Sequence, residues 1–357
     1  MKYKKYNKFM IFFIIITFVI LLSGCNSEVT PSQNEDKEIK EQSDSEYIMS
    51  TMVEMKVYGE EEEAEEVIED SFARMREIEN NMTRTQKDSV ISEINDKSGK
   101  EAVEVDDSRL EVLKTSIEYA EMTEGKFDPT IGPLVSLWGI GTEDARVPEQ
   151  EEIDEARELV NYKWLEIDEK KNLVELTKED MEIDLGAIAK GYAADEVKNI
   201  VEESSIESAF VNIGGNVMVI GSKTDGSDWK IGIQDPRIER GNVMGSINLK
   251  NKTVVTSGNY ERYFEEDDKI YHHILDPDTG RPARNNLLGV SIVTENSMKA
   301  DAISTSVFLM GLKDGREFVE NMEGVEALFI TEEEKVVLTS GLKGRFDIMN
   351  KDFSLDK

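Results

Sequence analysis

The predicted strands of this 357-residue chain come in closely spaced pairs, and this pairing constrains the fold more than any other sequence feature. Residues 208–213 and 216–220 are separated by a short turn, and the strand at 172–176 follows a polar turn that ends the strand before it. Parallel neighbours would need a crossover of a dozen or more residues. The sequence therefore predicts an α/β (α+β) fold with a mixed, largely antiparallel sheet and flanking helices.

Two common nucleotide-binding folds are excluded by missing motifs. No GxGxxG follows a predicted strand and no GxxxxGKS occurs, so the Rossmann and P-loop interpretations fail. No Pro/Ser-rich linker or internal repeat interrupts the body of the chain, and we predict a single domain over 47–350. Helices are predicted near 63–82, 108–124, 149–161, 187–203, 300–311 and 313–323, and the remaining strands near 48–57, 164–168, 229–234, 245–249, 252–256, 270–274, 288–294, 325–330 and 335–339.

The composition removes several classes of function. The chain has one Cys and two His, which excludes a disulfide framework, a Cys-based zinc site, an iron–sulfur cluster and a His-rich metal site. It has 42 Lys and Arg against 75 Asp and Glu, a formal net charge of −33. Nucleic-acid binding requires a basic face, so we predict no nucleic-acid partner.

The N-terminus has the features of an export signal. Four lysines within residues 1–8 precede an apolar stretch, Phe9–Leu22, that is shorter than the roughly 20 residues a spanning helix needs. Leu22-Ser23-Gly24-Cys25 then resembles a bacterial lipobox, and Cys25 is the only Cys of the chain. We predict a lipoprotein signal peptide at 1–24, a lipidated Cys25 and an extracytoplasmic, membrane-anchored protein; the alternative is an ordinary signal peptide. Polar residues through 46 predict a disordered tether over 25–46.

A predicted helix near residue 300 presents one carboxylate beside two hydroxyls. Asp301 and Thr305 are four residues apart and Ser304 lies between them, on the side opposite the apolar residues of the helix. Oxygen ligands of this kind suit a hard cation such as Mg²⁺. The alternative is that Asp301 only caps the helix.

A second cluster begins another predicted helix. Asp184 precedes small residues that let a ligand approach the backbone, and a helix N-terminus attracts phosphate. Lys190 adds a positive charge in the same turn. The alternative is a capped amphipathic helix with Lys190 in solvent.

Both histidines lie at the end of one predicted strand. His272 and His273 point to opposite faces of that strand, so at most one of them faces a site. Histidine is the natural proton carrier near neutral pH. The alternative is a structural histidine packed near the turn that follows.

The stretch from Phe127 to Gly139 is dense in Gly and Pro and predicts a shaped loop, either a pocket wall or a rigid crossing.

Six segments in this order resemble the ApbE family of FAD:protein FMN transferases. They are FDPTIGPLVSLWG, DLGAIAKGYAAD, FVNIGG, TSGNYERYF, HHILDPDTGRP and ADAISTSVFLMG, and the resemblance extends over about 47–346. It implies a T-fold-like domain that binds FAD as substrate and Mg²⁺ as cofactor. It also implies cleavage of the FAD pyrophosphate and attachment of FMN to a Thr or Ser of an acceptor protein. Such an acceptor belongs to an exported or membrane electron-transfer system.

The resemblance also implies roles for individual residues. The catalytic base is His273. The metal ligands are Asp301 and Thr305, the backbone carbonyl of Ala187, and Ser304. The flavin contacts are Met49, Lys126, Phe127, Asp128, Asp184, Lys190, His273, Ile274 and Leu275.

Two positions depart from the family pattern. Met49-Ser50-Thr51 stands where the family has Met-Gly-Thr, and Thr85 stands where many members have an aromatic residue. Loss of a stacking ring favours plain hydrolysis, so one alternative is a Mg²⁺-dependent FAD pyrophosphatase that releases FMN and AMP. The other alternative is a flavin-binding lipoprotein without turnover.

Overall fold

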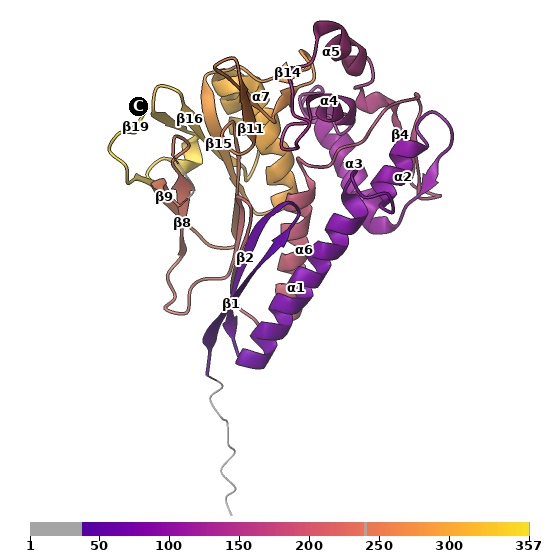
Figure 1. Ribbon diagram of the computed structural model, residues 1–357. Helices are drawn as coiled ribbons and strands as arrows, with labels where there is room; N and C mark the ends of the chain where they lie inside the picture. The colour runs from indigo at the N-terminus through magenta and orange to yellow at the C-terminus, as the bar shows by residue number, and fades with distance from the viewer. Residues whose placement is uncertain (1–37, 239–240, 357) are drawn as a thin grey trace, which may run out of the picture. The chain divides into compact units, whose positions relative to one another are not determined.

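The computed structural model describes residues 38–238 and 241–356, and within them the chain forms a mixed α/β fold (Figure 1). The predicted signal peptide, Cys25 and the first part of the tether lie outside the described residues. The helices are α1 (Glu61–Met82), α2 (Val90–Asp96), α3 (Asp107–Met122), α4 (Gly132–Trp138), α5 (Gln150–Arg157), α6 (Ala189–Glu203) and α7 (Ser297–Glu320), with 3₁₀ turns at Tyr162–Trp164 and Ser340–Leu342. The strands are β1 (Lys40–Ile48), β2 (Thr51–Gly59), β3 (Val103–Glu104), β4 (Leu165–Asp168), β5 (Leu173–Leu176), β6 (Ser208–Ile213), β7 (Asn216–Ile220), β8 (Trp229–Gln234), β9 (Val243–Leu249), β10 (Lys252–Gly258), β11 (Tyr263–Glu266), β12 (Lys269–His272), β13 (Leu275–Asp276), β14 (Arg281–Pro282), β15 (Leu287–Thr294), β16 (Glu326–Thr331), β17 (Lys335–Leu338), β18 (Phe346–Ile348) and β19 (Ser354–Leu355).

The central sheet has nine strands in the order β1-β2-β6-β7-β10-β15-β16-β17-β19. Every neighbouring pair is antiparallel except β17 and β19. The largely antiparallel sheet expected from the hairpin spacing is therefore confirmed.

Both faces of this sheet are buried, against two different cores. In β16, Ala327 and Phe329 belong to one core, and the alternating residues Leu328 and Ile330 belong to the other. This follows from the two-residue period of a strand, whose successive side chains point to opposite faces. A sheet buried on both faces reads as a continuous apolar run, as β15 and β16 do.

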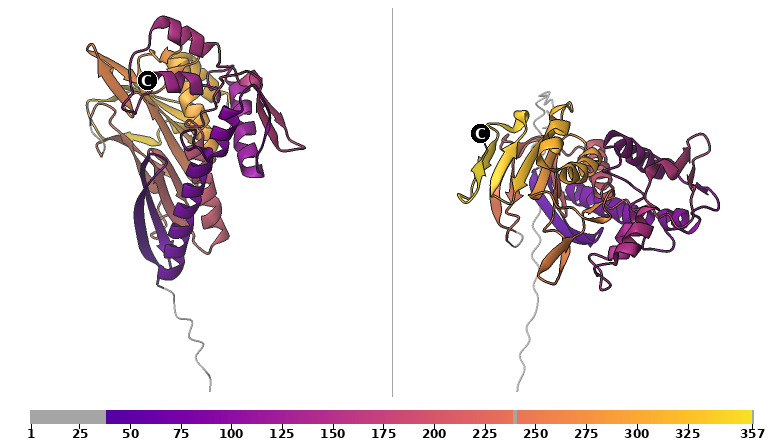
Figure 2. Two further views of the ribbon diagram at one scale, coloured as in Figure 1. Left: turned by 45° about the vertical axis from the view of Figure 1, so that its right-hand side comes forward. Right: turned by 90° about the horizontal axis from the view of Figure 1, so that it is seen from above.

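Helices α1, α6 and α7 cover one face of the sheet (Figures 1 and 2). In α1 the buried side chains recur at helical spacing, for example Val67, Ile68, Phe72 and Met75, and the acidic residues of its first turn lie near the helix N-terminus. The other face is covered by a small sheet in the order β18-β9-β8. The right-hand view of Figure 2 shows α2–α5 and β3–β5 extending to one side of the sheet.

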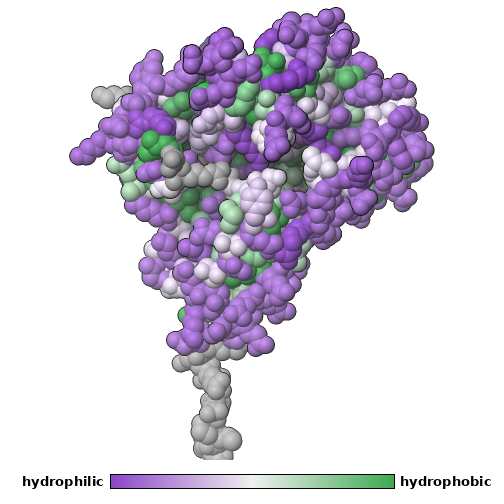
Figure 3. Space-filling view, viewed as in Figure 1, coloured by the Kyte–Doolittle hydropathy of each residue, from purple (hydrophilic) through white to green (hydrophobic). Residues whose placement is uncertain are grey.

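The face of the molecule that Figure 3 shows is mainly hydrophilic, as the acidic composition predicts. Within residues 38–238 and 241–356, no helix is long and apolar enough to cross a membrane.

The predicted tether is wrong for residues 40–46, which form most of β1. This strand pairs with β2 over its whole length, from Lys40 opposite Gly59 to Ile48 opposite Thr51. Most of its side chains are exposed, so backbone hydrogen bonds rather than apolar burial hold it in the sheet. A polar edge strand of this kind has no apolar periodicity to detect.

The folded region also extends past residue 350, because β19 pairs with β17.

The loop expected over 127–139 is wrong for its second half, which forms α4. Pro133 lies in the first turn of this helix, where its missing N–H costs no hydrogen bond. Gly139 follows the helix with φ 58°, the left-handed conformation that ends helices. The Gly and Pro residues that suggested a loop are therefore the start and stop signals of a short helix. The two helices predicted at 300–311 and 313–323 are confirmed as the two parts of α7, which are separated by non-helical backbone at Gly311 with φ 76°.

Helices α6 and α7 approach each other closely enough to exclude a side chain between them. A Cβ on Gly191 would lie 2.3 Å from the carbonyl oxygen of Ser297, so only glycine fits there. One turn further along α6, both carboxylate oxygens of Asp195 accept hydrogen bonds at 2.8 Å from the backbone N–H groups of Ser297 and Met298. Burial raises the pKa of Asp195 to about 6, against the opposite effect of these two hydrogen bonds. Asp195 therefore holds the N-terminus of α7 on α6.

We predict that Asp195→Ala lowers the free energy of unfolding by about 1–3 kcal/mol, because it leaves two buried N–H groups without acceptors. The measurement is urea denaturation at pH 7.5. The control is Asp70→Ala, on the exposed face of α1, which should change stability by less than about 0.5 kcal/mol. Equal stabilities of the two variants would contradict the role given to Asp195.

Candidate functional site

The candidate site is built around a buried carboxylate on α7. Asp301 is 4% exposed, and its Oδ2 accepts a hydrogen bond at 2.9 Å from the backbone N–H of Gly191. Gly191 is the third residue of α6, so its N–H is one of the first backbone donors of the helix, which have no partner within the helix itself. The interaction therefore brings Asp301 to the first turn of α6, and Ala187 lies two residues before the start of that helix.

Three hydroxyls lie together on the same side of α7. Ser257, at the end of β10, contacts Ser304 Oγ at 2.8 Å and Thr305 Oγ1 at 3.2 Å through its own Oγ. One carboxylate and several hydroxyls therefore lie within one turn of α7 and the adjoining end of β10, a set of oxygen donors that suits a hard cation. No group of three or more His, Cys, Asp or Glu that could hold a metal occurs in the described part of the chain.

The two histidines differ as the strand geometry predicted. His272 is buried, packs edge-on against Phe308, and lies 2.9 Å through Nε2 from the carbonyl oxygen of Ala283. His273 follows the last residue of β12, is half-buried, and lies 3.2 Å through Nδ1 from the carbonyl oxygen of Arg262. His272 is thus held inside the core, and His273 is the one that can reach a ligand.

Two positive charges face His273. Desolvation is the largest cause that lowers the pKa of His273, to about 3, and the charges of Arg262 and Lys190 lower it further. Lys190 precedes Gly191 in α6, so His273 and Asp301 both adjoin the first turn of that helix. His273 is therefore a neutral imidazole at physiological pH.

The turn between β1 and β2 forms another border of the site. Met49 and Ser50 both have positive φ, 55° and 58°, which is the geometry of a two-residue hairpin turn. Arg262 Nη2 donates to the carbonyl oxygen of Ser50 at 3.4 Å. This bond connects the turn to the segment that holds His273.

Ion pairs connect the segment 126–128 to the end of β13 and the turn that follows it. Lys126 Nζ lies 3.2 Å from Asp276 Oδ1 and 2.6 Å from Asp278 Oδ2. The carboxylate of Asp128 accepts from the backbone N–H groups of Thr130 and Tyr162, so its side chain shapes the loop. Phe127, Ile274 and Leu275 are buried with their side chains in the hydrophobic cores. The side chains of these three residues therefore pack in the protein interior that adjoins the site.

Asp184 lies in a cluster of charged side chains at the entrance to α6. Arg84 Nε donates to Asp184 Oδ2 at 2.7 Å, and Arg84 Nη1 donates to Glu182 Oε2 at 3.0 Å. Asp184 Oδ1 accepts from the N–H of Gly186 at 2.8 Å, just before the helix begins. Thr85, next to Arg84, is exposed.

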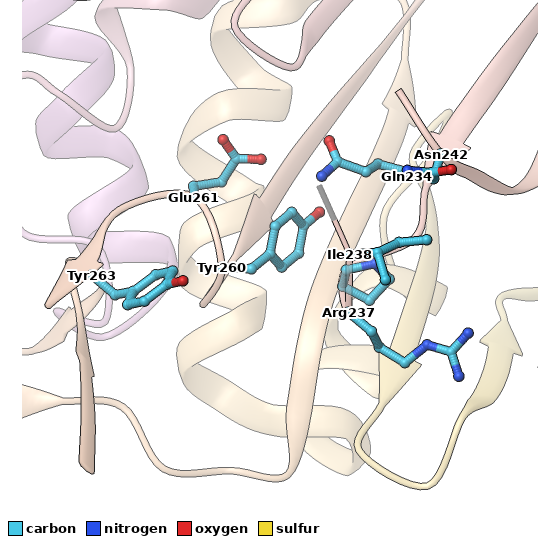
Figure 4. A pocket seen from close by; sticks show the side chains of 8 residues that line it. Gln234, Arg237, Ile238, Asn242, Tyr260, Glu261 and Tyr263 are labelled. Carbon is cyan, nitrogen blue, oxygen red and sulfur yellow. The ribbon is translucent and has the colours of Figure 1, made fainter. Parts of the chain in front are cut away.

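A pocket of about 670 Å³ lies beside the candidate site (Figure 4). Tyr260, Glu261 and Tyr263 line it from the segment that contains Arg262. The other lining residues are Gln234, at the end of β8, with Pro236, Arg237, Ile238 and Asn242.

Sequence reasoning missed three residues that the structure connects to the predicted ones. Arg84 contacts Asp184, Ser257 contacts Ser304 and Thr305, and Arg262 contacts His273. Ser257 and Arg262 lie within the segment TSGNYERYF, so they could have been found there. Arg84 could not, because its contact with Asp184 spans 100 residues.

Comparison with known proteins gives matches over most of the chain. The model of the ApbE family matches residues 49–329. A FAD:protein FMN transferase of Treponema pallidum is 31% identical over 334 residues, which are 89% of this chain and 92% of the relative. One of Vibrio cholerae is 35% identical over 249 residues, 69% of this chain and 74% of the relative.

Solved structures give the same match. The crystal structure of the ApbE protein of Thermotoga maritima has a TM-score of 0.80 and 38% sequence identity, and the match covers 86% of this chain and 99% of that one. The flavin transferase ApbE of Vibrio cholerae has a TM-score of 0.77 at 28% identity, over 86% of this chain and all of that one.

Proposed function

Since the chain belongs to the ApbE family, we propose that it is a FAD:protein FMN transferase, an enzyme that transfers FMN from FAD to a hydroxyl of an acceptor protein. The observation that carries the proposal is the convergence of a neutral imidazole, His273, with Lys190 and with the oxygen cluster around Asp301. A base, a cation that binds phosphate and a candidate metal site are the groups that phosphoryl transfer needs.

His273 is the proposed base. A neutral imidazole whose Nδ1–H donates to the Arg262 carbonyl has an Nε2 lone pair that can accept a proton. Nε2 accepts the proton of the incoming Thr or Ser hydroxyl as its oxygen bonds to the phosphorus of FMN. The bond from that phosphorus to the bridging oxygen breaks, and AMP leaves with this oxygen. Lys190 attracts the anionic phosphate groups to this place.

The oxygen cluster fits a magnesium ion. The proposed ligands are Asp301, Thr305 and Ser304, with the backbone carbonyl of Ala187, which lies two residues before α6, the helix whose first turn contacts Asp301. When bound, Mg²⁺ neutralises the negative charge of the pyrophosphate and of the leaving AMP. The remaining proposed FAD contacts are Met49, the 126–128 segment, Asp184 and residues 274–275.

Hydrolysis of FAD is the second candidate function, because Thr85 is exposed and offers no ring for stacking. Water would then take the place of the acceptor hydroxyl at His273, and the products would be FMN and AMP. Transfer and hydrolysis use the same base and the same metal, so only the acceptor distinguishes them.

We predict that the full-length protein, incubated with FAD and Mg²⁺, attaches FMN to a peptide that contains Thr-Gly-Ala-Thr. Mass spectrometry of the peptide measures the transfer, and the control peptide has Ala at both Thr positions. His273→Ala should lower the rate by about 10²–10⁴-fold because it removes the general base, and His272→Ala should have a much smaller effect. Free FMN with an unmodified peptide identifies a hydrolase instead, and bound flavin without AMP release identifies a protein that only binds flavin.

A second prediction concerns the metal. Asp301→Asn keeps an oxygen that can accept from Gly191 N–H but removes the negative charge. We expect the Mg²⁺ concentration needed for half-maximal AMP release to rise at least tenfold, a cost typical of disturbed metal sites. The matched control is Asp314→Asn, exposed on the same helix, which should leave the Mg²⁺ dependence unchanged. An unaltered dependence in Asp301→Asn would refute the assignment.

We further propose that the protein is anchored outside the cytoplasm by a lipid on Cys25 and serves an acceptor of an exported or membrane electron-transfer system. The support is the lipobox-like Leu22-Ser23-Gly24-Cys25 after a short apolar stretch.

Cys25→Ser should therefore move the protein from the membrane fraction to the soluble fraction, because it removes the site of lipidation. Immunoblotting of fractionated cells measures this change. Ser27→Ala, two residues further on, is the control and should remain with the membrane. A Cys25→Ser variant that stays in the membrane fraction would overturn the proposal.

A further inference from the structure

The two adjacent histidines are held in opposite tautomers. A carbonyl oxygen can only accept, so His272 must donate from Nε2 to Ala283, and its Nδ1 accepts from the N–H of Ile274 at 3.3 Å. By the same argument His273 must donate from Nδ1 to the carbonyl of Arg262. The Nε2 of His273 is then the acceptor nitrogen. The identity of the base atom therefore depends on where Arg262 places its carbonyl.

The β11–β12 hairpin sets this position. Its last pair is Tyr263 opposite His272, and the N–H of His273 donates to the carbonyl of Arg262 at 3.0 Å, which extends the ladder by one residue. The same carbonyl therefore accepts from both the backbone and the side chain of His273. A carbonyl oxygen has two lone pairs and can accept both bonds.

The side chain of Arg262 connects this hairpin to two other segments. Its Nη2 donates to the Ser50 carbonyl in the β1–β2 turn, and its Cδ would lie 3.7 Å from a Cβ on Gly141. Most other arginines in the described part of the chain, for example Arg74, Arg84 and Arg237, lie within 4.0 Å of a carboxylate. Arg262 has no such ion pair among the described residues, although the chain has 75 Asp and Glu. Its charge is therefore not neutralised by a neighbour.

We infer that Arg262 is a positioning residue for His273. Its carbonyl holds the imidazole in the tautomer whose Nε2 accepts a proton, and its guanidinium fastens that carbonyl to the β1–β2 turn. The inference rests on the proposed function only for the use of the base, because the hydrogen bonds exist in the protein without substrate.

The charge of Arg262 has a consequence that a purely structural residue would not have. Burial is the largest cause that lowers the pKa of His273, and the groups whose charge lowers it further are Arg262 from the segment before β11, Lys190 from α6 and the adjacent His272. Removing one positive charge raises the pKa of His273, and replacing it with a negative charge raises it further. Because Arg262 is exposed, added salt reduces the effect.

The test is ¹⁵N NMR of the full-length protein labelled in histidine, without FAD. The chain has only two histidines, so His272→Ala and His273→Ala assign both rings. We expect Nδ1–H for His273 and Nε2–H for His272 at pH 7. Arg262→Glu should raise the titration midpoint of His273 by about one pH unit or more, and Arg262→Gln by less. Arg262→Lys, which keeps the charge, should restore the low midpoint.

Arg284→Glu is the matched control. Arg284 is an arginine of the neighbouring segment whose charge acts on His272 and is not among the causes that shift His273. Its reversal should raise the midpoint of His272 and leave that of His273 unchanged. The inference is overturned if His273 is the Nε2–H tautomer, or if Arg262→Glu and Arg284→Glu move its midpoint equally.

A kinetic measurement separates this inference from the proposed function. If the protein transfers FMN, the acidic limb of the pH–rate profile of kcat should move to higher pH in Arg262→Gln and return in Arg262→Lys. If the protein has no transfer or hydrolysis activity while the NMR result holds, the proposed function fails and the positioning role stands. If activity is present but the tautomer is the opposite one, the positioning role fails alone.

Discussion

The structure depends on the close contact between α6 and α7, where the backbone N–H of Gly191 donates to the buried Asp301 carboxylate. Burying a carboxylate without hydrogen-bond partners costs free energy, and the N–H of Gly191 is such a partner. Only glycine fits at this position, because a Cβ would collide with the carbonyl oxygen of Ser297. Asp195, one turn further along α6, holds the start of α7 with two more hydrogen bonds. The same contact brings Asp301 to the residue that follows Lys190 in the chain. The contact that packs α6 against α7 therefore also forms part of the candidate site.

The candidate site also depends on the β11–β12 hairpin, because His273 follows directly after β12. The strict pairing of β11 and β12 fixes which residue lies opposite His273, and Arg262 connects that pair to the β1–β2 turn. Segments that are far apart in the sequence therefore meet around one imidazole. In a chain of net charge −33, Lys190 and Arg262 provide a local positive region that an anionic dinucleotide requires.

Much of this arrangement could be predicted from the sequence, and the exceptions have physical causes. Apolar periodicity predicted α1 and the central strands, because burial against a core imposes it. It could not predict β1, whose polar side chains leave only backbone pairing to hold it. It also misjudged α4, since Pro and Gly mark both loops and helix ends. The opposite faces of His272 and His273 followed from strand geometry, whereas Arg84 depended on a contact between distant segments.

The most direct test of this account is a crystal structure of the protein grown with FAD and MgCl₂. The account predicts the pyrophosphate between Lys190 and His273, with His273 Nε2 directed at it. It also predicts a metal ion on Asp301 and the flavin against the Met49–Ser50 turn. FAD bound instead in the pocket between residues 234 and 263, or a metal ion bound away from Asp301, would contradict it.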